Sequence, residues 1–560
     1  MRERIVTELI MSSLAYASEE MGITLRNSSY SPNIRDRMDH SCAILDAGGR
    51  LLAQAEHIPV HLGSLPWGLK KTLEFVECEG MELHDRDTLI VNNPYISGTH
   101  LNDITLITPI FFRNRIVAFS ASKAHHSDVG GKVPGSIPAD ATEIFQEGLI
   151  IDPVKLLRRG RLDESVLHIL SSNSRDPYQR LGDIKAQTAA NRLGRKRVQS
   201  ILEDHGISAF KNASETALNR SERMMRLSIS EFPDGSSEAV DWMEMPDMPE
   251  IQLKVRIIKQ ADRILIDYTG TAEQMKAPIN AVYGVTLSGV YFVMKCLTDP
   301  GIVMNDGCFR PVTVNVPEGT LLNPQFPFPV SAGNTETSMR NADILFKAMT
   351  RFAGNRVPAA CGGSMNNVMI GGVFRSKTWS FYETNAVGMG ASSELDGTDG
   401  VHCNMTNTLN SPVELVEVDY PVSIVKYQFR EGSGGTGKWR GGCGIERSYL
   451  IQAPNTSMTL MSEREFHSPW GLNGGDGGAT TEIFLNRGGK ITRVPSKCTL
   501  ELNEGDVVTI NTAGGGGYGR KEDRDFAKIE TDRRNGIMDA QNLTSVSPAW
   551  ITVRRHEKRR

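Results

Sequence analysis

Residues 92–131, NNPYISGTHLNDITLITPIFFRNRIVAFSASKAHHSDVGG, hold two strand-like segments and three of the twelve histidines in the chain. Segments 104–112 and 116–125 are rich in β-branched and apolar residues, and a short polar turn around Arg113 and Asn114 joins them. This pattern predicts an antiparallel β-hairpin. Together with the helical segments around it, this hairpin predicts a mixed α/β fold for the first part of the chain.

The register of this hairpin places an aspartate beside a histidine. A loop of two or three residues leaves position 102, 103 or 104 facing His125, and directly opposed β-carbons lie about 5 Å apart. His100 and Asp103 would point to opposite faces of a regular strand, but the preceding NNPYISGT is turn-forming and can aim His100 at the same point. Only one of His125 and His126 can face that point, and spacing alone does not choose between them.

Two imidazoles and a carboxylate with room for water suit a catalytic Zn2+, Mn2+ or Fe2+ ion. A structural zinc would call for a fourth protein ligand. In the alternative interpretation, these side chains only hydrogen-bond around a polar loop, because a short HxxD motif arises easily by chance. The hairpin register is the observation that favours the metal.

Other polar residues flank this stretch. Asp36 and Asp39 occur in RDRMDHSCAILD, and His57 and His61 occur in AEHIPVHLGSLP. Pro59 argues against a shared helical face for the two histidines, so we expect them to line the site rather than to form a ligand pair. Asp128, in SDVGG, is typical of an Asx–Gly turn that bonds its own backbone. His126 and Asp128 are the candidates for proton transfer.

Composition limits the classes of protein. The chain of 560 residues is 39% hydrophobic and 23% charged, which is ordinary for a globular protein of two to four domains. A net charge of -4 predicts neither nucleic acid nor an anionic membrane as partner. The N-terminal segment has helical spacing without a signal-peptide core, and the apolar stretch 281–297 is shorter than a membrane span. Eight scattered cysteines without a CxxC pair indicate a reduced, cytoplasmic protein.

Changes of pattern divide the chain into four parts. Residues 1–232 mix helices with the hairpin and form the expected metal-binding region, and residues 233–418 form a central α/β domain. From Tyr420 onward, repeated glycine-rich turns predict a β-rich domain over 419–520, followed by a charged extension over 521–560. We therefore predict a multidomain, mixed α/β (α+β) fold.

Several elements are predicted within these parts. A hairpin is expected over 41–54 and a helix after Pro66. Turn residues in FPDGSSEAVDWMEMPDMPE precede expected strands at IQLKVRII and RILIDYTG. A helix is expected to begin near Asn334, with an Asn or Thr side chain capping its first turn.

Two further motifs invite a chemical interpretation. The glycine run AGGGGYG lacks a following GK[ST] and a helix, so it does not predict a nucleotide site. Cys361, in PAACGGSMNN, has glycine neighbours that would allow attack by its sulfur, but buried packing is the commoner role of a lone cysteine.

Ordered blocks along nearly the whole chain resemble one family. They are AQAEHIPVHLGS, NNPYISGTHLNDITLITPIF, AHHSDVGG, DYTGTA, AGNTETS, YETNAVGMGA, DGTDGVHCNMTNT, SPVELVE, SGGTGKWRGGCG, PWGLNGG and GGGGYG. Through them the chain resembles the hydantoinase B/oxoprolinase family. Its members include subunits of ATP-dependent N-methylhydantoinase, 5-oxoprolinase, caprolactamase, and acetone and acetophenone carboxylases.

The resemblance carries expectations about partners and ligands. It implies a separate hydantoinase A-type subunit that binds ATP and Mg2+, in a hetero-oligomer such as α2β2. It also implies that His100, Asp103 and His125 hold a divalent metal, with Asp39 as a fourth candidate. Asn404 stands where the family often has histidine, and Met339 stands where it often has glutamine, which leaves the substrate contacts open.

Three functions remain in competition. The leading hypothesis is hydrolysis of a cyclic amide, of the hydantoin, 5-oxoproline or lactam type, after a partner phosphorylates it. His57, His61 and Asn404 would line the site. The alternatives are carboxylation of a ketone and a non-catalytic scaffold for the ATPase partner. The carboxylase subunits are often longer, which favours the amide hydrolase.

Overall fold

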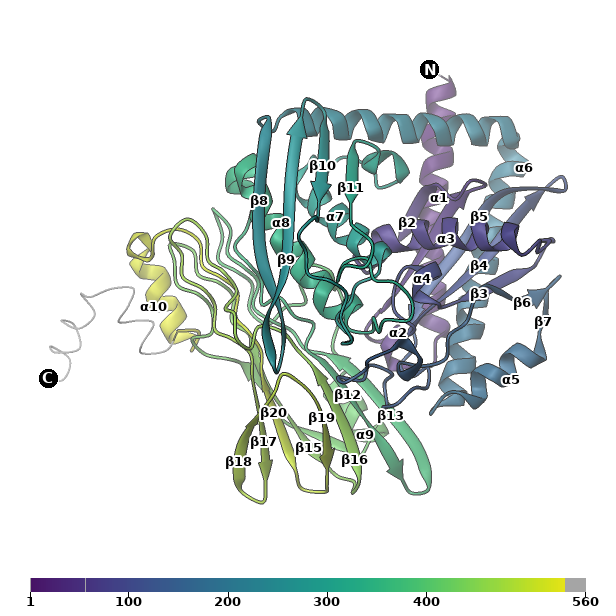
Figure 1. Cartoon of the computed structure of the whole chain (residues 1–560). Helices are drawn as coiled ribbons and strands as arrows, with labels where there is room; N and C mark the ends of the chain where they lie inside the picture. The colour runs from purple at the N-terminus through teal and green to yellow at the C-terminus, as the bar shows by residue number, and fades with distance from the viewer. Residues whose placement is uncertain (1, 56, 539–560) are drawn as a thin grey trace, which may run out of the picture.

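The computed structural model describes residues 2–55 and 57–538 and shows a mixed α/β architecture with four sheets (Figure 1). The first sheet has the strand order β2-β1-β5-β4-β3-β6-β7. Its strands are β1 (His40–Asp46), β2 (Leu51–Ala55), β3 (Thr88–Val91), β4 (Asp103–Phe112), β5 (Arg115–His125), β6 (Val154–Arg158) and β7 (Arg161–Leu162). The predicted hairpin is the β4–β5 pair at the centre of this sheet.

Helices cover both faces of the first sheet. They are α1 (Arg2–Ser28), α2 (Pro32–Arg35), α3 (His61–Cys78), α4 (Pro94–Ser97), α5 (Glu164–Ser172) and α6 (Pro177–Ser230), with the short η1 (Ile144–Gln146). On one face, Ala43 and Phe119 share a buried cluster with Leu69 of α3. On the other face, Ala118 and Ala124 pack with α1 and α6. Because side chains alternate along a strand, β5 directs His125 to the α3 face.

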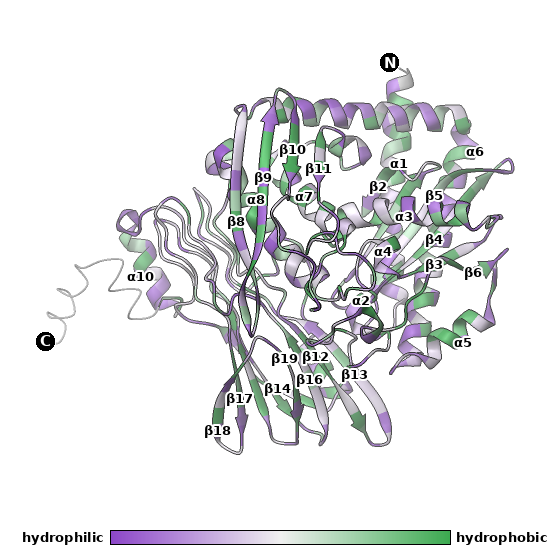
Figure 2. Cartoon of the chain, viewed as in Figure 1, coloured by the Kyte–Doolittle hydropathy of each residue, from purple (hydrophilic) through white to green (hydrophobic). Residues whose placement is uncertain are grey.

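The long helix α6 joins the first sheet to the central region. It changes direction at Gly206, whose φ of 79° and ψ of 159° are not helical. In Figure 1, α6 rises along one side of the molecule and then crosses its top toward β8. Figure 2 shows hydrophilic residues along much of this helix, which agrees with its position at the surface.

The central region is a four-stranded sheet packed against helices. The sheet has the order β11-β10-β9-β8. Its elements are β8 (Gly235–Met245), β9 (Met248–Gln260), β10 (Arg263–Asp267), α7 (Tyr283–Leu297), η2 (Asp306–Phe309), β11 (Val312–Asn315), η3 (Gly333–Thr337), α8 (Ser338–Ala353) and η4 (Gly354–Arg356). The largest hydrophobic cluster combines this region with buried residues of the first sheet, such as Ile104 and Leu106.

Two antiparallel sheets form a sandwich in the last part of the described chain. Their orders are β13-β12-β16-β19 and β14-β15-β20-β17-β18. The elements are β12 (Asn367–Phe374), β13 (Lys377–Thr384), α9 (Val413–Asp419), β14 (Val422–Phe429), β15 (Ile445–Ile451), β16 (Thr456–Met461), β17 (Glu482–Arg487), β18 (Lys490–Val494), β19 (Lys497–Leu502), β20 (Val507–Asn511), η5 (Lys521–Asp523) and α10 (Phe526–Arg534). One buried cluster, including Ile370, Tyr449 and Ile510, fills the space between the sheets.

The glycine-rich motifs are packed segments rather than simple turns between strands. They lie side by side as extended runs near α10 (Figure 1). A β-carbon on Gly515 would lie 2.1 Å from the Met389 carbonyl oxygen, and one on Gly441 would lie 1.9 Å from the Gly515 carbonyl oxygen. Only glycine permits backbones to approach this closely.

Three predicted elements need correction. Helix α3 begins at His61 and contains Pro66, which costs one internal hydrogen bond, and buried Leu65 and Leu69 on either side hold the helix on the sheet. Residues expected to be turns form β8, a strand paired with β9 from Gly235 onward. Neither η3 nor α8 has a side-chain cap. The side chains of Asn334 and Thr337 instead form hydrogen bonds with Asp103 and with the Ile279 carbonyl.

The predicted domain boundaries at 232, 418 and 520 stay predictions. One sheet combines β12 and β13 with β16 and β19, so it contains strands from both sides of residue 418. Of the predicted extension 521–560, residues 539–560 lie outside the described residues. Within the described ranges, no helix is long and apolar enough to cross a membrane, and the eight cysteines are free thiols.

Candidate metal centre

The β4–β5 register pairs Asp103 directly with His125, within the range predicted from the sequence. Helix α4 ends at Ser97, and the φ of 86° at the following Gly98 turns the chain so that His100 precedes β4 on a short bend. Asp103 Oδ1 lies 3.2 Å from His100 Nε2 and 3.4 Å from His125 Nδ1, and the two imidazole nitrogens are 3.1 Å apart. All three residues are at most 2% exposed.

Three more polar side chains surround this group. His61, the first residue of α3, places Nε2 3.4 Å from Asp103 Oδ2, and its Nδ1 lies 2.9 Å from Ser41 Oγ. Asn334 directs its amide nitrogen to the same Asp103 oxygen at 3.4 Å, which is why it does not cap the following helix. Asp39 lies at the edge of the group, with Oδ2 3.9 Å from His125 Nδ1.

A backbone carbonyl sets the orientation of His100. The Nδ1 atom of this ring lies 2.9 Å from the Ser331 carbonyl oxygen. Because a carbonyl can only accept, Nδ1 carries a hydrogen, and Nε2 is the nitrogen directed at Asp103 and His125. In the protonated ring Nε2–H donates to Asp103, and in the neutral ring the Nε2 lone pair is available to an ion. Metal-binding histidines are commonly oriented in this way.

The electrostatics of the group favour a bound cation. Burial raises the pKa of Asp103, but the charge of His100 and hydrogen bonds from His100, His125 and His61 outweigh burial and hold this pKa well below its usual value. Burial lowers the pKa of His100, but the attraction of Asp103 and its hydrogen bond raise it above the ordinary value overall. Burial lowers the pKa of His125. A buried carboxylate therefore faces two imidazoles.

An aromatic ring supports His125. Its imidazole stacks on Tyr382 with 4.5 Å between ring centroids and 11° between planes. The guanidinium carbon of buried Arg37 lies 4.8 Å from the centre of the same tyrosine ring. The Tyr382 hydroxyl donates to Asn367 Oδ1 at 2.7 Å, so the ring is held at both its face and its end.

The donor set fits a divalent transition metal. One atom from each of His100, Asp103 and His125 lies within 4.8 Å of the other two. Ligands about 2.1 Å from one ion in tetrahedral geometry lie about 3.4 Å apart, which is close to the separations here. Two nitrogens and one oxygen match Zn2+, Mn2+ or Fe2+ rather than Ca2+ or Mg2+.

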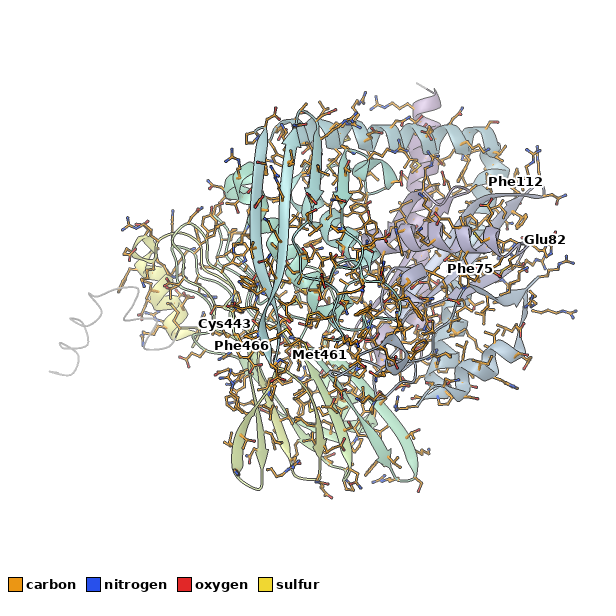
Figure 3. All side chains as sticks on the ribbon, viewed as in Figure 1. Phe75, Glu82, Phe112, Cys443, Met461 and Phe466 are labelled. Carbon is orange, nitrogen blue, oxygen red and sulfur yellow. The ribbon has the colours of Figure 1, made fainter. Side chains whose placement is uncertain are left out.

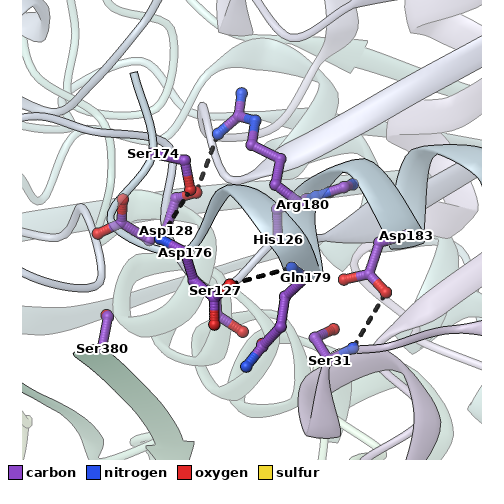
Figure 4. Close-up of a pocket in the computed structure, with 10 residues that line it drawn as sticks. All are labelled: Ser31, His126, Ser127, Asp128, Ser174, Asp176, Gln179, Arg180, Asp183 and Ser380. Atoms are coloured by element: carbon purple, nitrogen blue, oxygen red, sulfur yellow. Dashed lines mark hydrogen bonds between the residues drawn. The ribbon is translucent and has the colours of Figure 1, made fainter. Parts of the chain in front are cut away.

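His126 points away from this group. Its Nε2 lies 3.0 Å from Gln187 Oε1 on α6. The Gln187 amide nitrogen donates to the Ile104 carbonyl, which fixes Oε1 as the acceptor and places the His126 hydrogen on Nε2. Burial lowers the pKa of His126 to about 3. In Figure 4, His126 lines a small cavity at the start of α6 with Arg180 and Asp183.

Asp128 lines the same cavity and organises the loop that follows β5. Its carboxylate accepts hydrogen bonds from the backbone N–H of Gly130 and Gly135, and it pairs with Arg175 at 2.9 Å. The predicted Asx–Gly turn is therefore confirmed. The structure brings neither His126 nor Asp128 to the group formed by the three expected ligands.

The remaining expected lining residues lie in two other places. The His57 ring packs against His40, with 4.7 Å between centroids. Asn404 donates to Asp343 Oδ1 at 2.9 Å and to Cys361 Sγ at 3.1 Å. Only His61 of the three expected lining residues contacts the candidate metal ligands.

Cys361 is 4% exposed, and a contact with Cys403, together with burial, raises its pKa well above the usual value. A protonated thiol in this setting supports the packing interpretation.

Sequence reasoning missed Ser331, Asn334 as a group facing Asp103, and Tyr382. Ser331 and Asn334 lie 231 residues beyond their partners in the chain. No local spacing relates such distant positions, so only the folded chain brings them to His100, Asp103 and His125.

Known proteins share this architecture. The sequence pattern of the family described as Hydantoinase B/oxoprolinase matches residues 3–521. An uncharacterized protein of Methanocaldococcus jannaschii is 47% identical over 95% of this chain and 93% of its own length. The 5-oxoprolinase 1 of Arabidopsis thaliana is 34% identical over 90% of this chain, which spans only 40% of that longer protein.

Two solved structures have the same fold. The ATP-dependent caprolactamase of Pseudomonas jessenii superposes with a TM-score of 0.90 at 26% identity, covering 97% of this chain and 95% of that chain. Nucleotide-free acetone carboxylase superposes with a TM-score of 0.92 at 20% identity, covering 97% and 79%. Both confirm the predicted mixed α/β, multidomain fold.

Proposed function

Because the chain belongs to the hydantoinase B/oxoprolinase family, we propose that it is the metal-carrying subunit of an ATP-dependent hydrolase of cyclic amides. The observation that supports this most strongly is the buried group of His100, Asp103 and His125. Its two imidazoles and one carboxylate leave coordination positions for water or substrate, as in catalytic rather than structural metal sites.

A second polypeptide supplies ATP in this proposal. The chain covers 95% of the caprolactamase chain it resembles but 40% of 5-oxoprolinase 1. We therefore propose a hydantoinase A-type partner that corresponds to part of the remaining length of 5-oxoprolinase 1 and binds ATP and Mg2+. The assembly would be a hetero-oligomer such as α2β2.

The proposed chemistry divides between the two subunits. An unstrained amide resists water because its carbonyl carbon is a weak electrophile and its nitrogen leaves poorly. Transfer of a phosphoryl group from ATP to the amide oxygen, in the partner, removes both difficulties. A divalent ion held by this chain would supply a water of lowered pKa and polarise the reacting oxygen.

Side chains next to the three metal ligands would accept the proton that the attacking water loses. His61 Nε2 and the Asp39 carboxylate both border the ligand group, at the distances given above. Either can accept the proton released when water adds to the carbon that bears the phosphorylated oxygen. The placement of His126 on the opposite face of the strand favours these two groups over His126 and Asp128.

Ketone carboxylation is the second candidate function, because the superposition on acetone carboxylase, like that on caprolactamase, covers 97% of this chain. In that reaction, the same three ligands would stabilise an enolate oxygen while its carbon bonds to CO2. The third hypothesis, a scaffold without a metal, gives no reason for a buried carboxylate between two imidazoles.

The test uses the complex of this chain with its co-expressed ATP-binding partner. ATP consumption and ring opening are measured with hydantoin, N-methylhydantoin, 5-oxoproline and caprolactam, and with acetone and acetophenone, each with and without bicarbonate. We expect a cyclic amide to be opened without bicarbonate, and His100→Ala to abolish ring opening. If the complex turned over a ketone but no cyclic amide, and did so only with bicarbonate, the proposed function would be ketone carboxylation instead of amide hydrolysis.

A further inference from the structure

We propose that Glu147 is a positioning residue for the metal centre, which it serves by holding the backbone that fixes the tautomer of His100. This inference rests on the proposed metal site. Glu147 does not touch the three ligands, and it lies 47 residues beyond His100 in the chain, at the end of η1. It acts through Ser331.

The contacts form a continuous series from the Glu147 carboxylate to the imidazole. Oε1 of Glu147 accepts the backbone N–H groups of Val330 and Ser331, both at 2.9 Å, and Oε2 accepts Val330 N–H at 3.0 Å. The carbonyl of Ser331 then accepts Nδ1–H of His100 at 2.9 Å. One residue, Ser331, is thus held by its N–H and orients the imidazole by its carbonyl.

Burial of this carboxylate calls for an explanation beyond packing. Glu147 is 0% exposed and makes no ion pair among the described residues. Burying a carboxylate is costly unless it is well hydrogen-bonded, and an apolar residue could fill the same volume without that cost. Two backbone N–H groups directed at one oxygen are the compensation, and the same stretch of backbone presents the Ser331 carbonyl to His100.

The segment around Ser331 has other anchors as well: Ala332 N–H, in the same peptide unit as the Ser331 carbonyl, donates to the Pro278 carbonyl at 2.8 Å. Ile144 N–H donates to the Pro327 carbonyl, and the Asn280 side chain donates to the Pro329 carbonyl. In the part of the chain that the structure describes, only the Glu147 side chain binds the N–H groups of residues 330 and 331. Its loss would leave two buried donors unpaired, so the backbone at 330–331 would shift and change the distance and angle between the Ser331 carbonyl and His100.

The expected consequence is a weaker and differently shaped metal site in a folded protein. With a weakened acceptor at Nδ1, His100 can place its hydrogen on Nε2, where it blocks the lone pair that binds the ion. Loss of such outer hydrogen bonds typically weakens metal affinity about 10–100-fold. We therefore expect Glu147→Ala to raise the dissociation constant for Zn2+ and Co2+ at least about tenfold.

The experiment compares full-length wild type, Glu147→Ala, Glu147→Gln and the control Glu143→Ala. Glu143 is an exposed glutamate four residues earlier on the same segment. Metal affinity is measured by chelator competition, the ligand field by the visible absorption spectrum of the Co2+ form, and folding by circular dichroism. Glu147→Ala should show weakened binding and a changed spectrum, and Glu143→Ala should match wild type.

Glu147→Gln keeps one oxygen that can accept both N–H groups, but its amide hydrogens oppose Val330 N–H, so we expect an intermediate affinity. Wild-type affinity and spectrum in Glu147→Ala would overturn the inference. If that variant does not fold, the same result in Glu147→Gln would overturn it. Failure of wild type to bind Co2+ or Zn2+ is a different outcome, because it contradicts the metal site of the proposed function itself.

Discussion

Asp103 is the residue on which the candidate metal centre converges. It faces His100, His125 and His61, and it receives the Asn334 amide as well. These four partners come from a bend, a strand, the start of helix α3 and the distant helical segment η3. A single carboxylate therefore links the first sheet with the central region.

A buried aspartate in helix α6, Asp183, predicts that the stability of the protein depends on pH. Asp183 accepts N–H groups of Tyr30 and Ser31, and burial raises its pKa from 3.8 to about 6. Between these values the folded state binds more protons than the unfolded state, so the wild type loses stability as pH rises from about 4 to about 6. Two pKa units correspond to about 3 kcal/mol.

Asp183→Asn removes this ionisation and keeps a carbonyl acceptor. We expect the melting temperature of the variant, relative to wild type, to rise between pH 4 and 6 and to stay level above about pH 6.5. Paired thermal denaturation series in the same buffers check the slope. A constant difference across this range would show that Asp183 ionises normally in the folded protein.

Residue-level prediction succeeded where spacing carries information. The strand pattern and loop length limited the position opposite His125 to 102, 103 or 104, and the structure pairs Asp103 with His125. Hairpin geometry could not choose between His125 and His126, because neighbouring strand residues differ only in the face they occupy. The family resemblance indicated His125, and in the structure it is His125 that lies beside Asp103 and His100.

At the level of elements, the position of His100 depends on the close approach of α3 to the turn before it. A β-carbon on Gly68 would lie 2.3 Å from the Ser97 carbonyl oxygen, and one on Gly284 would lie 2.6 Å from the Gly98 carbonyl oxygen. Helices α3 and α7 therefore pack, through these glycines, in direct contact with the backbone of the segment that leads to His100. Replacing either glycine must displace backbone.

Gly68→Ala tests this packing. We expect it to lower the free energy of unfolding by about 1–3 kcal/mol, because overpacking shifts backbone, and to weaken Zn2+ binding through the displaced turn. Denaturation and chelator competition measure the two effects. Gly48→Ala is the matched control, since its β-carbon would have only ordinary contact, at 3.5 Å from Asp46 Oδ1. Equal stability and affinity in the two variants would contradict this role of α3.

Elements were predicted well where periodicity is strong and poorly where tertiary packing overrides it. The hairpin of β1 and β2 follows from its alternating pattern and turn. Helix α3 was expected to start after Pro66, yet burial of its apolar face extends it back to His61. Strand β8 was missed because Asp, Gly and Ser near its start are typical of turns, and its pairing with β9 outweighs that preference.

At the scale of the whole molecule, a buried ionic cluster joins the central region to the C-terminal sandwich. The Glu463 carboxylate forms ion pairs with the guanidinium of Arg340 in α8, at 2.8 Å, and with the ammonium of Lys497 in β19, at 2.6 Å. All three side chains are fully buried. Glu244, near the end of β8, accepts the backbone N–H of Phe466. Figure 3 shows Met461 and Phe466 where the tip of the β8–β9 hairpin meets the lower sheets.

Glu463→Gln should destabilise the protein strongly. Removing one member of a buried ion pair leaves the others uncompensated and typically costs about 3–5 kcal/mol. Calorimetry should show a lower melting temperature for Glu463→Gln. Glu530→Gln, which removes a partly exposed surface partner of Arg533 and Arg534, should leave it nearly unchanged. Equal effects of the two substitutions would show that the cluster does not join the two regions.

The global architecture was predictable as a class but not as an arrangement. Composition and alternating patterns indicate a mixed α/β chain with a β-rich end. They do not show that β12 and β13 join a sheet with β16 and β19, nor that the glycine runs pack backbone to backbone. Such pairings join segments far apart in the chain, and each depends on all the others being in place.

The metal content of the purified chain tests the central claim most directly. Elemental analysis of wild type and of His100→Ala, with circular dichroism as the control for folding, decides whether His100, Asp103 and His125 hold an ion. We predict close to one equivalent of Zn, Mn or Fe in the wild type and its loss in the folded variant. Absence of a transition metal from wild type, with activity of the assembled complex unaffected by His100→Ala, would contradict the account.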